Sequence, residues 1–227
     1  MSLLPAVIIE SKIRQTASLI FLHGLGDDGR GWAETFQNVV PPYCKIICPN
    51  AKVMPVSLNF GMEMPAWYDL YGLDADARQD EPGIVSASKE LAKWIAAENQ
   101  AGIPSERIVI GGFSQGGSVS LYYGATNRDK KLGGLVALSC WLPLHEKVIQ
   151  DTSSAATSCS VPILQCHGQS DPLVAYDLGS QTNSVLRKLG FCNCTLKSYP
   201  GMGHCSGDRE IRDVKSFLET CLPSTAE

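Results

Sequence analysis

The chain has 227 residues, of which 44% are hydrophobic and 19% charged, a composition typical of one globular α/β domain with a sizeable core. Its net charge is −4 and its isoelectric point is near 5.6, so no basic surface favours nucleic-acid binding. No apolar run approaches the roughly 20 residues of a membrane span, and residues 1–9 lack the positive charge of a secretion signal, so we expect a cytoplasmic protein.

Short apolar runs alternate with helix-like segments along the chain. After a short strand within residues 1–9, the expected elements in chain order are strand Ala17–Leu22, helix Trp32–Val39, strand Lys45–Cys48, helix Ile84–Ala101, strand Arg107–Gly111, helix Gly117–Ala125, strand Gly134–Leu138, strand Val161–Cys166, helix Asp177–Leu189, strand Thr195–Tyr199 and helix Ile211–Cys221. Strands that read as continuous apolar runs are typically covered on both faces. The alternation therefore predicts a mostly parallel, doubly wound sheet flanked by helices, in a single domain spanning residues 1–227.

Residues 49–83 interrupt this alternation, because they contain four prolines and show little periodicity. A loop of this length without regular structure inside a compact domain usually has a function. Its many apolar side chains are also unlike those of a solvated linker. Two compatible interpretations remain open: a loop packed on the core, and a lip over the active site that supplies apolar contacts to a substrate.

Residues 112–116 read Gly-Phe-Ser-Gln-Gly, a G-x-S-x-G pattern between an apolar run and a helix-like segment. The pattern is typical of a nucleophile elbow, in which a serine stands at the apex of a sharp strand-to-helix turn. Such a turn crowds the backbone, and glycine two positions before and after the serine relieves the crowding. The pattern alone is common, so its meaning depends on whether a base and an acid accompany Ser114.

A candidate base and a candidate acid follow Ser114 in the order that hydrolases of this architecture use, serine, acid and then histidine. His204 is the histidine in the last quarter of the chain, in a glycine-containing turn between the last expected strand and helix. Asp171 leaves the carboxyl end of an expected strand, where the catalytic groups of open sheets gather. We therefore expect Ser114, Asp171 and His204 to form a catalytic triad. Four other acidic residues lie between the serine and the histidine without following a strand so directly: Asp129, Glu146, Asp151 and Asp177.

Two backbone N–H groups are needed to stabilise the oxyanion of such a reaction. One is expected from Gln115, the residue after the nucleophile. The second is expected from the loop His23-Gly24-Leu25-Gly26-Asp27, whose glycines allow the backbone to turn its amides inward. Leu25 is the expected donor, and His23 is expected to stabilise the loop rather than to transfer a proton.

Nine cysteines are scattered along the chain, with no C-x-x-C pair and no histidine at zinc-binding spacing. An odd, scattered set is typical of reduced thiols in the cytoplasm. We expect neither a metal nor a cofactor, because a serine mechanism requires neither.

Taken together, these motifs resemble those of the cytosolic acyl-protein thioesterases, which belong with the lysophospholipases and small carboxylesterases of the α/β-hydrolase fold. The resemblance covers the chain from about Leu4 to Pro223 and is carried by residues 23–27, 111–117, 138–143, 164–168, 171–174 and 64–69. It implies an α/β-hydrolase fold without a separate cap domain, a triad of Ser114, Asp171 and His204, and oxyanion amides at Leu25 and Gln115. It also implies hydrolysis of thioester-linked palmitate from protein cysteines, with activity on lysophospholipids and simple esters.

The resemblance further implies an acyl channel lined by Trp141 and by the 49–83 loop. The candidate wall residues from that loop are Leu58, Met64, Trp67 and Leu73. Expected partners are S-acylated proteins and lysophospholipids as substrates, with transient contact to a membrane surface, no nucleic acid, and a monomer or weak homodimer. Three positions depart from the family pattern: Ser2 replaces a cysteine that is acylated in well-known vertebrate members, and Gly203 and Cys205 flank His204 in place of methionine and serine.

Two other functions remain open at this point. One is a lysophospholipase or general carboxylesterase that uses the same triad on a different preferred substrate. The other is a lipid-binding protein without catalysis, against which the complete set of Ser114, Asp171 and His204 argues.

Overall fold

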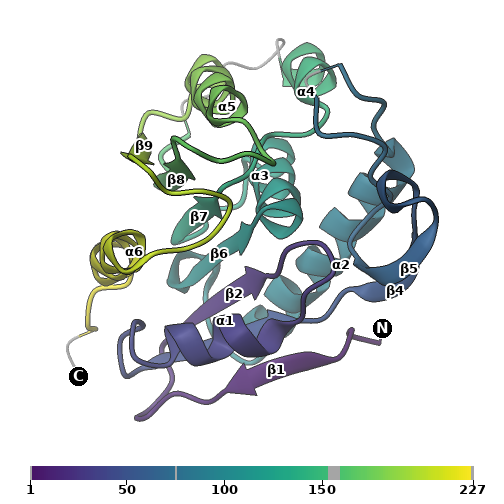
Figure 1. The fold of residues 1–227 in the computed structure, drawn as a ribbon. Coiled ribbons are helices and arrows are strands. Elements are labelled where there is room, and N and C mark those ends of the chain that lie inside the picture. The colour runs from purple at the N-terminus through teal and green to yellow at the C-terminus, as the bar shows by residue number, and fades with distance from the viewer. Residues whose placement is uncertain (1, 75, 153–158, 226–227) are drawn as a thin grey trace.

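A seven-stranded sheet forms the centre of the computed structural model, which describes residues 2–74, 76–152 and 159–225 (Figure 1). The strand order is β1-β3-β2-β6-β7-β8-β9; β1 pairs antiparallel with β3, and the other neighbours pair in parallel. The sheet strands are β1 (Ala6–Ile9), β2 (Ala17–Leu22), β3 (Cys44–Pro49), β6 (Ile108–Phe113), β7 (Gly134–Leu138), β8 (Ile163–Gly168) and β9 (Cys194–Tyr199). This arrangement confirms the predicted mostly parallel sheet.

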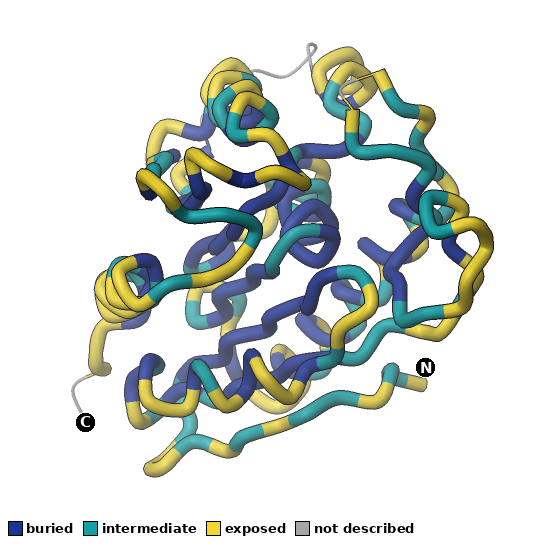
Figure 2. Tube along the Cα trace, viewed as in Figure 1, coloured by how far each residue is buried: buried dark blue, intermediate teal, exposed yellow. Residues whose placement is uncertain are grey.

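Helices cover both faces of the sheet, because side chains along each strand alternate between two cores. In β2, Ile20 and Leu22 belong to one core, and Leu19 and Phe21 belong to the other. The first core is closed by α2 (Glu81–Gln100), α3 (Gln115–Thr126), α4 (His145–Thr152) and α5 (Tyr176–Lys188), and the second by α1 (Gly29–Phe36) and α6 (Asp208–Cys221). Figure 2 shows the central strands buried between these layers. Burial on both faces explains why the strands read as continuous apolar runs.

Residues 49–83 differ from the expectation of a loop without regular structure. They form an antiparallel hairpin of β4 (Lys52–Val56) and β5 (Met62–Ala66), joined by the 3-10 turn η1 (Ser57–Asn59), and α2 already begins at Glu81. Each of the two strands contains a proline, and proline ordinarily argues against a strand. A two-stranded ribbon tolerates it because each strand has one edge without a partner.

The remaining differences are small. Neither α4, in which few apolar side chains mark a buried face, nor the 3-10 turn η2 (Ser105–Arg107) was expected from the sequence. The other expected helices and strands begin and end within three residues of the observed ones. In the part of the chain that the structure describes, no helix is long and apolar enough to cross a membrane.

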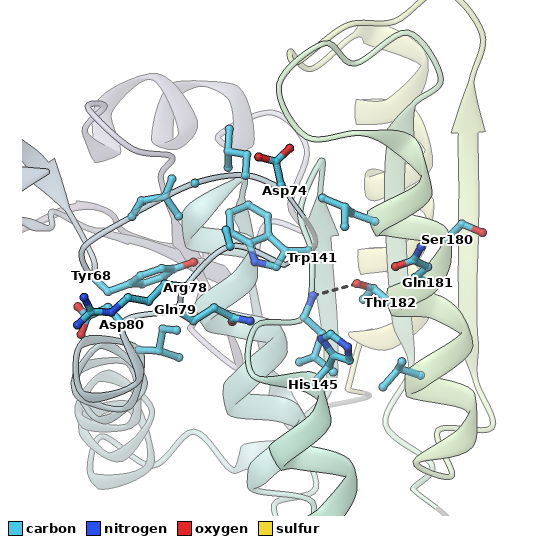
Figure 3. Close-up of a pocket in the computed structure, with 18 of the residues that line it drawn as sticks. Tyr68, Asp74, Arg78, Gln79, Asp80, Trp141, His145, Ser180, Gln181 and Thr182 are labelled. Carbon is cyan, nitrogen blue, oxygen red and sulfur yellow. Dashed lines mark hydrogen bonds between the residues drawn. The ribbon is translucent and has the colours of Figure 1, made fainter. Parts of the chain in front are cut away.

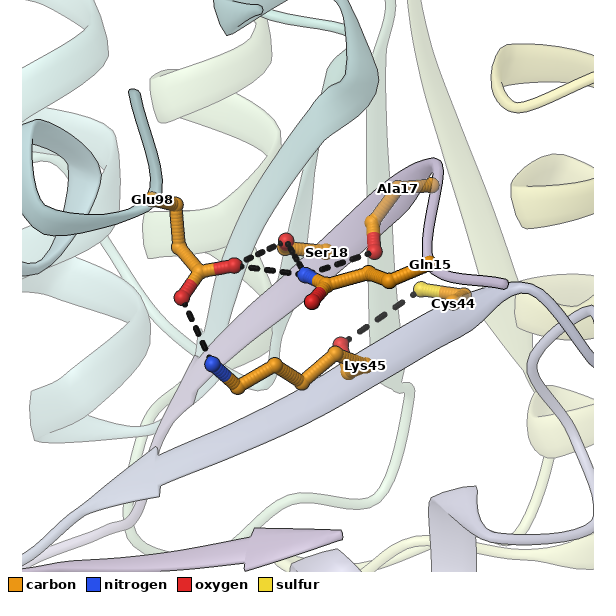
Figure 4. Close-up of polar contacts among 6 residues, drawn as sticks. All are labelled: Gln15, Ala17, Ser18, Cys44, Lys45 and Glu98. Atoms are coloured by element: carbon orange, nitrogen blue, oxygen red, sulfur yellow. Dashed lines mark hydrogen bonds and ion pairs between the residues drawn. The ribbon is translucent and has the colours of Figure 1, made fainter. Parts of the chain in front are cut away.

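Glu98 joins the C-terminal half of α2 to two strands of the sheet (Figure 4). Its carboxylate accepts hydrogen bonds from Ser18 Oγ at 2.6 Å and Gln15 Nε2 at 2.7 Å, and from the Lys45 ammonium at 2.9 Å. Burial by itself would raise the pKa of Glu98, but these three donors outweigh it and the pKa is lowered. The carboxylate is therefore ionised and fully engaged, although only 3% of the residue is exposed.

Replacing this buried carboxylate is expected to destabilise the fold. Glu98→Ala should lower the free energy of unfolding by about 3 kcal/mol, because it leaves the Lys45 ammonium largely buried without its partner. The matched control is Glu90→Ala, which removes the half-buried pair with Lys93 on the same helix; this pair is more exposed than Glu98 and Lys45, and its loss should cost less than about 1 kcal/mol. Urea denaturation measures both, and equal losses in the two variants would contradict the assignment.

Candidate active site

The segments that carry the expected site residues all leave the carboxyl ends of parallel strands. Residues 23–26 follow β2, Ser114 follows β6, Asp171 follows β8 and His204 follows β9. Because these strands are parallel, their carboxyl ends lie at one edge of the sheet, where open α/β sheets hold their ligands. The topology therefore brings together groups that are as many as 181 positions apart in the chain.

Ser114 stands on a sharp turn between β6 and α3. Its backbone has a φ of 51° and a ψ of −120°, which a non-glycine residue adopts only when its surroundings enforce it. Its N–H donates to Leu138 O at 2.9 Å, which fixes the turn to β7. At Gly116 a Cβ would lie 2.3 Å from Leu22 O, so only glycine lets α3 start this close to β2. The packing explains the second glycine of the G-x-S-x-G pattern.

Ser114, His204 and Asp171 form a continuous line of hydrogen bonds. His204 Nε2 lies 2.9 Å from Ser114 Oγ, and His204 Nδ1 lies 2.7 Å from Asp171 Oδ2. An ionised carboxylate only accepts hydrogen bonds, so Nδ1 carries the proton and Nε2 accepts from the serine hydroxyl. This tautomer is the one that a general base for Ser114 needs.

The acid is held by its own turn. Asp171 Oδ1 accepts hydrogen bonds from the N–H groups of Leu173 and Val174, both at 2.9 Å, and its side chain is fully buried. These contacts leave Oδ2 directed at His204. A carboxylate that accepts three hydrogen bonds has little freedom to rotate away from the histidine.

The loop that carries His204 packs closely on the loop that carries Asp171. Ser170 N–H donates to Met202 O at 3.1 Å, and a Cβ at Gly168 would lie 2.2 Å from the same carbonyl oxygen. On its other side, the His204 ring packs against Phe113 with a centroid separation of 4.8 Å. The histidine is thus confined between the acid and the residue before the nucleophile.

His167 is a buried histidine beside the acid to which the sequence analysis assigns no role. Its Nε2 lies 2.8 Å from Val174 O and 3.6 Å from Asp171 Oδ2. Burial lowers the pKa of His167, so the ring is neutral and its Nε2–H donates to the carbonyl oxygen. The sequence signal for it was a histidine directly after the expected strand Val161–Cys166.

The two expected oxyanion donors belong to the segments that follow the neighbouring strands β2 and β6. Among the described residues, no acceptor takes a hydrogen bond from the backbone N–H of Leu25 or of Gln115. His23 anchors the first loop: its Nδ1–H donates to Gly24 O at 2.7 Å and its Nε2 accepts from Ala51 N–H at 3.0 Å. Burial lowers the pKa of His23, so it remains neutral in this structural role.

An apolar pocket of about 330 Å³ lies between residues 68–80, the segment after β7 and helix α5 (Figure 3). Trp141 and Leu73, two of the five candidate channel residues, line it. Trp141 follows Leu138 by three residues, and Leu138 O accepts the hydrogen bond of the Ser114 N–H, but no residue of the expected triad lines this pocket. Four apolar lining residues outside the 49–83 segment were not expected from the sequence: Ile84, Leu142, Leu178 and Val185. Of these, Leu178 and Val185 share a helical face at a spacing of seven residues, a signal that was present in the sequence.

The other three candidate channel residues lie outside the lining of this pocket. Trp67 is buried, and its Nε1–H donates to His23 O at 2.9 Å, so it contacts the oxyanion loop. Leu58 and Met64 are half-buried and pack on the same core as Leu25. The hydrogen bond of the Trp67 indole N–H fixes the position of this side chain, and the apolar character of the segment gives no indication of that bond.

A family model described as phospholipase/carboxylesterase matches residues 4–222. The chain belongs to this family. Acyl-protein thioesterase 1 of Mycosarcoma maydis is 40% identical over 242 aligned positions, which cover 99% of this chain and 100% of the fungal protein. Acyl-protein thioesterase 1 of Neurospora crassa is 38% identical, over 98% of this chain and 94% of that one.

The fold of this chain is also similar to that of a solved acyl-protein thioesterase structure. The crystal structure of Zea mays acyl-protein thioesterase 2 has a TM-score of 0.88 at 30% identity and covers 96% of this chain and 99% of that chain. These findings confirm the predicted α/β-hydrolase fold and the predicted relation to the acyl-protein thioesterases, and they identify the chain as a serine hydrolase. Among the described residues, no group of three or more His, Cys, Asp or Glu side chains is placed to hold a metal ion.

Acid is expected to destabilise the protein partly through His167. Because the pKa of His167 is lowered in the folded state, the unfolded chain takes up a proton that the folded protein does not, and the free energy of unfolding falls as the pH drops below about 6.5. His167→Gln retains an amide donor for Val174 O and does not titrate. Urea denaturation between pH 7 and 5 should therefore show a smaller loss for the variant, by at most about 1.4 kcal/mol per pH unit, the slope for one proton. An identical pH dependence in both proteins would exclude this role.

Proposed function

We propose that this enzyme hydrolyses thioesters that link palmitoyl and related long-chain acyl groups to protein cysteines. The observation that carries the proposal is the line of hydrogen bonds from Ser114 through His204 to Asp171. The apolar pocket that Trp141 and Leu73 line is the candidate site for the acyl chain. Relatives that align over nearly the whole chain are named acyl-protein thioesterases, which supports the same substrate class. Lysophospholipids, which also carry a long acyl chain on a reactive carbonyl, are a second substrate class for this site.

The first half of the proposed reaction forms an acyl-serine. Ser114 Oγ attacks the thioester carbonyl carbon while His204 Nε2 takes its proton, and Asp171 stabilises the resulting imidazolium. The carbonyl oxygen becomes an oxyanion that accepts hydrogen bonds from the Leu25 and Gln115 N–H groups. The intermediate then reforms its carbonyl, the C–S bond breaks, and the protein cysteine leaves with the proton that His204 returns to it.

The second half restores the enzyme. Water attacks the acyl-serine carbonyl, with His204 Nε2 again accepting a proton and the same two amides holding the oxyanion. The bond from the acyl carbon to Ser114 Oγ breaks, the serine recovers its proton from His204, and a fatty acid leaves. Each step is carried by residues of the chain.

The pocket supplies binding for the acyl chain in this proposal. Burial of each methylene contributes about 0.8 kcal/mol, so an apolar wall favours long chains over short ones. Residues 68–80 form one wall of the pocket. We treat residues 1–227 as a single domain, and we assign the 49–83 segment as the part of that domain that covers the active site. Trp141 and Leu73 then contact the chain, while Leu58 and Met64 border the oxyanion loop side.

A direct comparison of substrates tests the proposal. We expect a higher kcat/KM on a palmitoyl-peptide thioester than on lysophosphatidylcholine, because the thiolate is the better leaving group, and we expect Ser114→Ala to lose at least about 1,000-fold on both. Labelling by a fluorophosphonate probe, absent in Ser114→Ala, reports the nucleophile. A strong preference for the lipid would favour the lysophospholipase instead, and a wild-type protein without labelling would favour a binding protein.

We further assign this enzyme to the cytoplasm, with transient contact to membrane surfaces. Seven cysteines are free thiols that are at least partly buried, and burial raises the pKa of Cys44 and Cys48 to about 12, which is consistent with a reducing compartment. The β4–β5 hairpin exposes three large apolar side chains, with Phe60 fully exposed, Met62 65% exposed and Val53 64% exposed. Apolar side chains grouped on one exposed element favour contact with a lipid surface or with a second copy of the chain.

Polar substitution of the hairpin tests the membrane contact. Phe60→Ser with Met62→Ser should reduce co-sedimentation with phosphatidylcholine/phosphatidylserine vesicles at least about threefold, because it removes exposed apolar area that the bilayer would cover. The control is Ile13→Ser, which removes an apolar side chain of similar exposure (57%) far along the chain from the hairpin. A variant that binds vesicles as the wild type does, but loses a weak dimer in analytical ultracentrifugation, would assign the hairpin to self-association.

A further inference from the structure

We propose that residues Pro65–Tyr68 form a strut that fixes the positions of the two oxyanion donors relative to each other, with Trp67 as its central positioning residue. The strut consists of the last two residues of β5 and the two residues that follow it. The inference rests on the reaction proposed above, in which the Leu25 and Gln115 N–H groups bind the oxyanion. It adds a role for a segment that, among the described residues, forms no hydrogen bond with Ser114, Asp171 or His204.

One end of the strut holds the loop that carries Leu25. Pro65 O accepts a hydrogen bond from Gly26 N–H at 2.8 Å, directly after the donor residue. Two residues later, Trp67 Nε1–H donates to His23 O at 2.9 Å, and the Trp67 and His23 rings pack with a centroid separation of 5.2 Å. The loop is therefore held on both sides of Leu25, at positions 23 and 26.

The other end of the strut holds the residue that carries the second donor. The Gln115 side chain accepts from Trp67 N–H at 3.0 Å through Oε1, and its Nε2–H donates to Tyr68 O at 2.8 Å. Ser118 Oγ–H donates to Gln115 O at 2.6 Å, so the Tyr68 hydroxyl, 2.6 Å away, donates to Ser118 Oγ. The side chain and the carbonyl of Gln115 are both engaged, and only 1% of the residue is exposed.

These contacts matter because the two donors belong to segments 90 positions apart in the chain. An oxyanion hole stabilises the transition state when both donors are already placed where the charge develops, and a small misplacement of one donor loses most of its contribution. Within the strut, Trp67 is the residue that forms hydrogen bonds with both segments, through its indole to His23 and through its backbone N–H to Gln115. Removing the indole N–H should therefore loosen the Leu25 loop relative to Gln115.

A change confined to the oxyanion hole has a specific kinetic signature. The uncharged carbonyl of the bound substrate interacts only weakly with the oxyanion donors, whereas the transition state interacts strongly. Displacing a donor therefore lowers kcat and leaves KM unchanged. An alkyl trifluoromethyl ketone adds the serine hydroxyl to give a tetrahedral oxyanion adduct, so its inhibition constant rises with the loss in kcat. A merely structural role for Trp67 would lower the thermal midpoint and leave both quantities unchanged per folded active site.

The test compares two buried tryptophans. Trp67→Phe deletes the N–H that binds His23 O, whereas Trp94→Phe deletes an indole N–H that has no partner among the described residues; the two tryptophans are 8% and 7% exposed. With p-nitrophenyl acyl esters, and active sites counted by fluorophosphonate titration, Trp67→Phe should lose about tenfold in kcat with KM within about twofold, and should weaken the ketone by about tenfold. Trp94→Phe should change neither quantity by more than about twofold.

Other outcomes decide against the strut. Unchanged kcat and ketone affinity in Trp67→Phe, or equal losses in Trp67→Phe and Trp94→Phe, would overturn it. If Trp67→Phe fails to fold, the test uses Tyr68→Phe, which removes only the hydroxyl that is hydrogen-bonded to Ser118. This variant should lose about threefold in kcat, and the inhibition constant of the ketone should rise by the same factor. No change in either quantity would overturn the inference. Failure of the underlying reaction is distinct, because it would appear as hydrolysis that survives Ser114→Ala.

Discussion

The close approach of α3 to β2 is the constraint on which the rest of the site depends. At Gly116 the helix begins against the carbonyl of Leu22, with no room for a Cβ, and the chain reaches it through the left-handed φ of Ser114. A residue with positive φ at this position is unfavourable in isolation and persists because the sheet on both sides determines it. This turn places the Ser114 hydroxyl beyond the sheet edge, 2.9 Å from His204 Nε2.

The parallel sheet extends this constraint to the other catalytic groups. Each parallel strand ends at the same edge, so the loops after β2, β6, β8 and β9 converge without needing any contact between their own sequences. Short backbone bonds then fix the loops to each other, such as Ser170 N–H on Met202 O and Ser114 N–H on Leu138 O. The catalytic groups are therefore held in fixed positions, because they lie on turns that a buried sheet supports. The walls of the apolar pocket come from other segments, namely residues 68–80, the segment after β7, and helix α5.

The sequence predicted those parts of the molecule that depend on local pattern. The strands are buried on both faces, so they appear in the sequence as continuous apolar runs. The glycines of the nucleophile elbow are also recognisable, because the sharp turn leaves no room for side chains at those positions. The hairpin at residues 52–66 was missed because Pro55 and Pro65 break the usual strand pattern in a ribbon that tolerates them. The comparisons bear out the fold and family, and the roles of the individual site residues remain predictions that their geometry supports.

Long-range polar contacts account for what the sequence did not reveal. Trp67 was expected in the acyl channel because it is large and apolar, but its indole N–H finds its acceptor in His23, 44 positions earlier. His167 directly follows the expected strand Val161–Cys166, and its acceptor, Val174 O, lies in the turn that also binds Asp171. A pairing between one donor and one distant carbonyl leaves no periodic trace, so no local pattern identifies it.

The histidines around the acid show how the site directs its charge. Asp171 Oδ2 lies 2.7 Å from His204 Nδ1 and 3.6 Å from His167 Nε2, so two imidazoles compete for one carboxylate. Burial lowers the pKa of His167, and its Nε2–H is already given to Val174 O, so this ring stays neutral and offers the carboxylate no charge. A second cation at that distance would weaken the stabilisation that Asp171 gives to the imidazolium of His204. Keeping His167 neutral thus reserves the negative charge of Asp171 for the histidine that contacts the nucleophile, which is the one that becomes charged during the reaction.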